Sequence, residues 1–449
     1  MTAIVLCLLA FGLCYKAGKR SLGYGMVALL AVGYFYGIIR ANVLTSFSHF
    51  IFDCGLLGLY SSQRLLKVDP KDRGRVEQLR MWIIVLMLWC VLLVPLPFQP
   101  FLVSLVGWRG NVFFLPMLLL GSRMKDEDLQ ELSTGFAILN LAALGFAGAE
   151  YFKGVETFYP PSAVTSIIYA STDVAGGYFR IPAIFNNAHA FGGTMVASLP
   201  YLIGGWDRAE TKRRRMLNIL GIAAALLGIL MSATRQNFVI GTVLVLVVLL
   251  TRRGSIASLL VFLLLIGAAV YVAMTNERFQ RFKSLGDTGA VSDRIAGSVN
   301  RGFFEILLQY PMGNGLGGGG TSIPYFLSGQ VRNPIGMENE YARILCEQGI
   351  IGLLLWLGFV IWFFSRVGTA FAKGLWVNCR RMVWCLAAFS LATSWIGVGL
   401  LTAIPQTPIL LMGMGWTATW SAAEFSRARV KATARRPLYQ GQPMAIARG

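Results

Sequence analysis

The sequence predicts an all-α polytopic membrane protein, a bundle of about 12–13 spanning helices with a large late extracytoplasmic loop. Of its 449 residues, 55% are hydrophobic and 14% are charged, which is too apolar for a soluble enzyme of this length. Apolar runs long enough to cross a bilayer recur along the chain, and basic residues gather between alternate runs. A chain that crosses lipid repeatedly must satisfy its backbone hydrogen bonds within helices.

The apolar runs place the expected helices. We expect spans at roughly 2–15, 22–39, 46–63, 81–97, 111–121, 133–150, 188–205, 217–231, 238–250, 255–274, 348–364, 383–401 and 407–420. The first run has no basic residues before it and no clear small-residue cleavage site after it, so we interpret it as a retained helix. The short first and fifth runs could be re-entrant.

The net charge of +19 is explained by membrane orientation and does not indicate nucleic acid. With the N-terminus outside, more than two thirds of the 40 Lys and Arg residues lie in the loops of one side. Because cytoplasmic loops carry excess positive charge, we expect that side and the C-terminus to be cytoplasmic. Residues 1–420 form the predicted bundle. Residues 421–449 form a basic tail that we expect to lie disordered on anionic lipid heads.

The cysteines indicate neither a disulfide framework nor a metal site. Seven cysteines lie in or beside predicted helices, and none forms a CxxC pair. Buried cysteine acting as a small apolar residue explains this distribution. We therefore expect no metal and no cofactor.

Two outer loops are long, 151–187 and 275–347. Long loops in compact proteins are usually functional or disordered. In the second loop, residues 300–310 resemble a short helix lying in the membrane interface.

The glycine-rich run 312–320 follows. It contains G-x-G-x-x-G without the strand–turn–helix context of a dinucleotide site. It is either a flexible turn or a place where backbone N–H groups approach a phosphate or sugar.

Arginines in the outer loops are candidates for anion binding: Arg180, Arg235, Arg294, Arg301 and Arg343. Each could instead extend toward lipid head groups. Arg235 lies in the short turn SATRQN between two apolar runs, which leaves it little freedom. Because guanidinium binds phosphate bidentately, converging arginines would hold a diphosphate without a metal.

Both histidines have two interpretations. His49 and Asp53 are four residues apart on one helical face inside an apolar run, which indicates either a proton relay or a buried contact that fixes packing. His189 follows Asn187 at the expected start of a helix. It is either a satisfied helix-start residue or part of a site lined by both side chains.

The segment ENEYARILCEQGIIG, 338–352, places many polar groups at the start of an apolar helix. Glu338 could complement the helix dipole, or could act as a general base whose pKa is raised by partial desolvation. Asn339 and Tyr341 would then position a sugar acceptor. Glu347 fits a role in starting the helix and in close packing.

These segments resemble the O-antigen ligase and polymerase superfamily of bacteria. The resemblance rests on four motifs. They are Arg180 followed by Phe185, Asn186 and Asn187, the short turn from Ser232 to Arg235, "P-x-G-x-G" from Pro311, and 338–352 with its "E-x-G-I-I-G-L-L". Together these motifs cover roughly residues 175–365. The resemblance implies a metal-independent, inverting glycosyltransferase at the outer face of the bacterial inner membrane. Its donor would be a polyprenyl-diphosphate-linked oligosaccharide.

The resemblance also implies roles for particular residues. Arg180 and Arg235, with Arg294 and Arg301 as further candidates, would hold the diphosphate, and Glu338 would activate the acceptor. The ligases have His where this chain has Glu338, which favours a polymerase of O-antigen or exopolysaccharide. Its acceptor would be another lipid-linked glycan, with a flippase and a chain-length regulator as candidate partners. A ligase acting on lipid A core, a proton-coupled transporter using His49 and Asp53, and a non-catalytic scaffold are the alternatives.

Overall fold

The computed structural model describes residues 1–63, 73–170, 179–251, 288–297, 302–320, 323–337, 339–397 and 399–420, with residues 267, 271, 275, 276 and 282. The regular elements in these ranges are all helical. The α-helices are α1 (Thr2–Arg20), α2 (Leu22–Asn42), α3 (Ile51–Gln63), α4 (Arg73–Leu93), α5 (Phe101–Val112), α6 (Met117–Ser122), α7 (Asp126–Lys153), α8 (Ser166–Tyr169), α9 (Ala188–Arg208), α10 (Lys212–Met231), α11 (Arg235–Thr251), α13 (Thr288–Ala296), α14 (Phe304–Gln309), α15 (Glu340–Ser365), α16 (Val367–Phe371), α17 (Val377–Thr393) and α18 (Gln406–Thr419). The 3-10 helices include η1 (Ser46–Phe50), η3 (Val155–Thr157) and η7 (Tyr325–Gln330).

Within the described residues, 7 helical segments are long and apolar enough to cross a membrane. They are Thr2–Arg20, Leu22–Asn42, Val76–Leu93, Phe101–Ser122, Asp126–Lys153, Lys212–Met231 and Glu340–Phe371. The predicted all-helical class is therefore confirmed, and these long apolar helices are consistent with a polytopic membrane protein. The number of crossings and the size of the late loop stay predictions. The expected span 255–274 lies largely outside the described residues.

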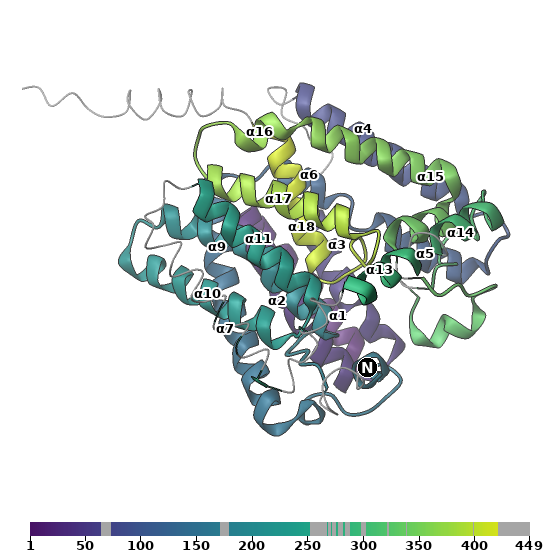
Figure 1. Ribbon diagram of the computed structural model, residues 1–449, viewed down its shortest axis with the longest axis horizontal. Coiled ribbons are helices and arrows are strands. Elements are labelled where there is room, and N and C mark those ends of the chain that lie inside the picture. Colours follow the sequence, from purple (N-terminus) through teal and green to yellow (C-terminus); the bar gives the residue numbers. More distant parts are fainter. Residues whose placement is uncertain are drawn as a thin grey trace, which may run out of the picture.

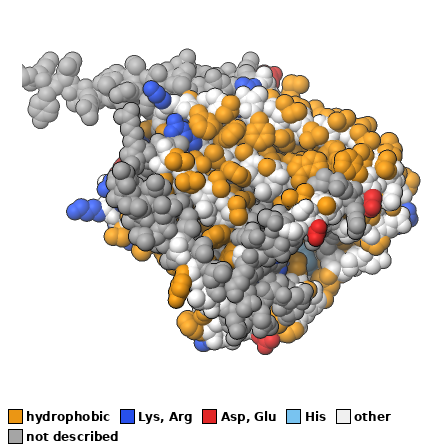
Figure 2. Space-filling view, in the orientation of Figure 1, with side chains coloured by type: hydrophobic (Ala, Val, Ile, Leu, Met, Phe, Trp, Pro, Cys, Tyr) orange, Lys and Arg blue, Asp and Glu red, His pale blue; other side chains and the backbone are white. Residues whose placement is uncertain are grey.

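The outer surface of the bundle is apolar along its long helices. Side chains such as Leu354 and Ile361 of α15, and Met81 of α4, are more than half exposed. Figure 2 shows hydrophobic side chains gathered over the part of this face where Figure 1 places α15. Exposed apolar surface of this extent suits contact with lipid.

Helix α18 forms the centre of the bundle. Every residue from Thr407 to Ala418 is buried, and α18 packs against α6, α9 and α17. Glycines bring two of these helices together, because a Cβ added at Gly121 would lie 1.9 Å from the carbonyl oxygen of Met412. Small residues allow such close backbone approach between helices.

The long helix α15 is interrupted near its start. Gly349 adopts φ +69°, a left-handed conformation that breaks the helical hydrogen-bond pattern. The glycine-rich run and the preceding Pro311 supply hydrogen-bond partners at the break. Ile350 N–H donates to the carbonyl of Pro311 at 3.0 Å, and Asn314 N–H donates to that of Cys346 at 2.5 Å. Residues 340–348 thus form a short, fully buried helix ahead of the longer apolar one.

The glycine-rich run is packed between two helices. A Cβ added at Gly107 of α5 would lie 2.2 Å from the backbone nitrogen of Gly317. On the other side, Gly313 lies against Gly349 of α15. Glycine is required at these positions because the backbones approach closely and because some of them have positive φ. The glycine-rich run therefore packs tightly between α5 and α15. The predicted short helix within 300–310 is also present, as α14 beside the start of α15 (Figure 1).

Candidate functional site

Three of the predicted site residues meet at the start of α9. Asn187 is the N-cap, and its Oδ1 accepts a hydrogen bond from Ala190 N–H at 2.8 Å. His189 is exposed in the first turn. Nη1 of Arg180 lies 3.0 Å from His189 Nε2. The chain therefore folds back so that Arg180, nine residues earlier, reaches the first turn of α9.

The turn that carries Arg235 meets the same helix end. Asn237 Nδ2 donates to the carbonyl oxygen of His189 at 3.2 Å and to Thr234 Oγ1 at 2.9 Å. Gly192 permits this contact, because a Cβ added there would lie 2.5 Å from Ser232 Oγ. Arg235 is half-buried as the first residue of α11.

His189 is therefore contacted from both sides, through its ring by Arg180 and through its carbonyl by the Arg235 turn. We call Arg180, Asn187, His189, Arg235 and Asn237 the arginine cluster. The Arg180 guanidinium and the side-chain amide of Asn237, from distant parts of the chain, come together at this helix end, and Arg235 lies two residues before Asn237. Such a set is suited to binding an anion.

The start of α15 has its backbone donors already bonded. Asn339 Oδ1 accepts from Tyr341 N–H at 2.9 Å and from Ala342 N–H at 3.1 Å. Glu340 N–H donates to the carbonyl of Ser394 at 2.9 Å, and Arg343 N–H donates to that of Asn339. These donors are not open to a phosphate, so the phosphate-binding mode of helix N-termini is not used here. The Tyr341 hydroxyl donates to the carbonyl of Leu391 at 2.9 Å.

A buried ionic network explains most of the polar residues in 338–352. Arg343 is fully buried, with Nη2 2.7 Å from Glu340 Oε1 and Nη1 2.9 Å from Glu347 Oε2. Asn111 of α5 donates from Nδ2 to Glu347 Oε2 at 2.6 Å. Its Oδ1 accepts from Gln348 Nε2 at 2.9 Å. We call these five residues the charge network. Buried charges need partners of this kind because desolvation is expensive.

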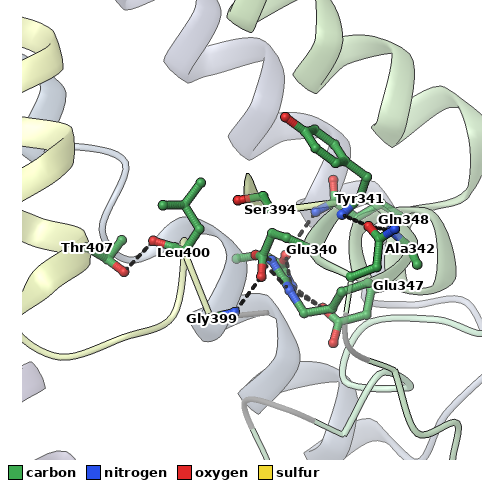
Figure 3. Close-up of polar contacts among 12 residues, drawn as sticks. Glu340, Tyr341, Ala342, Glu347, Gln348, Ser394, Gly399, Leu400 and Thr407 are labelled. Atoms are coloured by element: carbon green, nitrogen blue, oxygen red, sulfur yellow. Dashed lines mark hydrogen bonds and ion pairs between the residues drawn. The ribbon is translucent and has the colours of Figure 1, made fainter. Parts of the chain in front are cut away.

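The connection between α17 and α18 joins the charge network to the arginine cluster. Glu340 Oε2 accepts from the backbone N–H of Gly399 at 2.7 Å, as Figure 3 shows. At the end of α17, where this connection begins, Gln236 Nε2 donates to Thr393 Oγ1 at 2.7 Å. Gln236 directly follows Arg235. The predicted diphosphate-binding turn and the predicted acceptor-activating segment are thus both anchored to residues 393–399.

Other predicted site residues fall beyond what the structure describes. Glu338 and Arg301 lie outside the described residues, as does the side chain of Arg294, whose backbone belongs to α13. The roles predicted for these three residues stay predictions. The roles predicted for Asn339 and Tyr341 also stay predictions, and their contacts above add structural roles.

His49 and Asp53 have different partners. Asp53 Oδ2 accepts from Arg109 Nε of α5 at 2.6 Å. The ring of His49 packs against those of Tyr325 and Phe326 in η7, with centroids 5.8 and 5.5 Å away. Both residues are buried. The Asp53 contact joins α3 to α5, and the His49 contacts join η1 to η7 in the late loop. This arrangement suits the packing interpretation of the pair.

Sequence reasoning missed Arg109, Asn111 and Glu150, which are central to these contacts. Asn111 stands at the start of an expected apolar run, and an amide at such a position was a usable signal. Glu150 ends another expected run and is completely buried. Its partner is the backbone N–H of Ala183, which donates to Glu150 Oε2 at 2.9 Å, so no pattern in the side chains indicated the contact.

The comparisons with known proteins add no support to the resemblance, which therefore rests on its sequence motifs alone. Neither the protein-family models nor the curated proteins that were searched include a match to the chain. Within the described part of the chain, no group of three or more His, Cys, Asp or Glu side chains is arranged to hold a metal ion.

Proposed function

We propose that this protein is a membrane glycosyltransferase, a polysaccharide polymerase that uses a polyprenyl-diphosphate-linked donor. It would transfer the glycan to a sugar hydroxyl of another lipid-linked repeat unit. The observation that carries the proposal is the double contact of His189. Nη1 of Arg180 lies within hydrogen-bonding distance of Nε2 in its ring. Asn237, in the turn that carries Arg235, donates a hydrogen bond to its backbone carbonyl. These arginines belong to two separate motifs of the resemblance.

The proposed reaction is a single displacement. The acceptor hydroxyl oxygen forms a bond to the anomeric carbon, and the bond between that carbon and the diphosphate oxygen breaks. The electron pair leaves with the polyprenyl diphosphate, and the hydroxyl proton passes to Glu338. Inversion follows from attack opposite the leaving group.

The arginine cluster would supply the main catalytic stabilisation. Negative charge grows on the departing diphosphate, and prearranged cations or donors at that position lower the barrier most. Two guanidinium groups can each bind two phosphate oxygens. Because they provide the positive charge, the proposed transfer is metal-independent.

The proposal includes an orientation. The distribution of Lys and Arg supports a cytoplasmic C-terminus, and with it an arginine cluster that would face the periplasm from a bacterial inner membrane. A flippase would deliver the donor to that face, and a chain-length regulator would act on the product.

The test uses the purified full-length protein in nanodiscs with polyprenyl-diphosphate-linked repeat units and EDTA, with products resolved on gels. Arg180→Lys and Arg235→Lys should each lower kcat by about 100-fold, because a point charge does not replace a bidentate fork. The control is Arg332→Lys. Arg332 is an exposed arginine whose Nη1 donates to the carbonyl of Pro97, so its replacement should leave kcat unchanged. Near-normal activity in both cluster variants would remove these arginines from the site.

A further inference from the structure

The segment that carries Arg180 contains a strained turn. Ala183 adopts φ +53°, a left-handed conformation that is uncommon for any residue other than glycine. Such a conformation costs on the order of 1–3 kcal/mol and persists only where the surroundings enforce it. Arg180 lies three residues before Ala183, and the helix cap Asn187 lies four residues after it.

Hydrogen bonds from three other segments of the chain hold this turn. Glu150 of α7 accepts on Oε2 from the backbone N–H of Ala183 at 2.9 Å. The Tyr159 hydroxyl donates to the carbonyl of Phe185 at 2.6 Å, and Ile38 N–H of α2 donates to that of Ile184 at 3.2 Å. Of these contacts, the one from Glu150 acts on the strained residue itself.

Glu150 is an expensive residue to bury. It is 0% exposed, and within the described part of the chain its Oε1 has no hydrogen-bond partner. A carboxyl group in such surroundings is unfavourable unless a specific interaction compensates. The compensating interaction that the structure provides is the bond to Ala183 N–H.

We infer that Glu150 is a positioning residue that holds the left-handed turn at Ala183 and so directs Arg180 toward His189 and the diphosphate. The diphosphate part rests on the proposed function. The link runs from the end of α7, through the Ala183 turn, to the Arg180 contact at the first turn of α9.

The first experiment measures amide hydrogen exchange of the segment 181–187 in the purified full-length protein. Glu150→Gln keeps a carbonyl acceptor for Ala183 N–H, and Glu150→Leu does not. We expect exchange to rise about tenfold or more in the Leu variant and to stay within about threefold of wild type in the Gln variant. Equal exchange in wild type and Glu150→Leu would overturn the inference.

A matched control is available on the same helix. Asp128, near the other end of α7, is also buried and accepts from the backbone N–H of Gly23 at 2.8 Å. Asp128→Leu should reduce overall stability while leaving exchange at 181–187 unchanged. A rise at 181–187 in this variant as large as in Glu150→Leu would show a general loss of structure and count against the positioning role.

The second experiment measures binding of inorganic diphosphate by calorimetry. Glu150→Leu should weaken binding about tenfold, equivalent to about 1.4 kcal/mol, and should add no further loss in an Arg180→Ala background. Adding Ala183→Gly to Glu150→Leu should restore part of the affinity, because glycine adopts positive φ without strain. Additive losses in the double variant would overturn the inference. Wild-type protein that does not bind diphosphate would instead count against the proposed function, and the exchange result would then decide the role of Glu150.

Discussion

Glu340 and Gly399 are joined by a hydrogen bond of 2.7 Å across 59 residues of sequence. The other oxygen of the same carboxylate pairs with Arg343. One side chain therefore ties the first turn of α15 to the connection between α17 and α18, and places the segment after Glu338 at a defined position. The charge network is the structural basis of this arrangement, and its parts can be removed separately.

Arg343→Met should destabilise the protein by about 3–5 kcal/mol, because it leaves Glu340 and Glu347 buried without their shared cation. Thermal unfolding of the detergent-solubilised protein measures the effect. The matched change Arg332→Met, at an exposed position, should stay within about 0.5 kcal/mol of wild type. Converting both carboxylates to amides in the Arg343→Met background should recover much of the loss. Equal stability of the two Met variants would mean that the network contributes nothing measurable.

Gly349→Ala should destabilise the break in α15. At φ +69° and ψ −175° the backbone is in a region open almost only to glycine, which costs a residue with a Cβ on the order of 1–3 kcal/mol, and the added Cβ would lie 2.8 Å from the carbonyl of Met312. Gly145→Ala is the control, because nothing lies within 4 Å of a Cβ added there. That change in the middle of α7 should be neutral or stabilising by about 0.5–1 kcal/mol. Similar unfolding temperatures in the two variants would show that the break tolerates a side chain.

The variant Asp53→Asn distinguishes the proposed polymerase from the alternative of a proton-coupled transporter. It removes the negative partner of Arg109, and we expect a stability loss of about 1–3 kcal/mol with glycan polymerisation retained. Polymer is measured on gels from cells with and without a protonophore, with expression checked. Loss of function in the variant, together with dependence of the wild type on the proton gradient, would favour the transporter.

Glu338→Ala should abolish polymerisation if Glu338 accepts the acceptor proton. Glycan profiles of cells carrying Glu338→Ala or Glu338→His measure this, and we expect single repeat units in the Ala variant. Polymer that forms but is no longer attached to lipid A core would identify a ligase. An unchanged profile in both variants would leave Glu338 as a carboxylate at a helix start.

Helix positions could be predicted well from the sequence. The expected spans 188–205 and 407–420 correspond to α9 (Ala188–Arg208) and α18 (Gln406–Thr419). Long apolar runs allow few conformations other than helices, because each backbone polar group must be bonded within the run. The expected span 111–121 differs, since the structure has α5, a turn at Phe113–Pro116, and then α6. Proline at the end of that turn prevents a continuous helix.

The partners of polar residues could not be predicted. Asp53 and Arg109 are 56 residues apart, and Asn111 and Glu347 are 236 apart. A local pattern shows that a polar group is buried but not which distant group it contacts.

The packing of the glycine-rich run could not be predicted for the same reason. Its composition indicated either a flexible turn or a ligand contact, whereas its packing depends on Gly107 of α5, far earlier in the chain.

The Asn111 contacts also imply an order of assembly. Helix α5 is synthesised long before α15, yet the side-chain amide of Asn111 bonds both Glu347 and Gln348. Until residues 340–348 have been made, that amide lacks these partners. Loop closure over more than 200 residues is slow relative to local helix formation. The bonds between Asn111 and α15 therefore form late in assembly, when the start of α15 packs against α5.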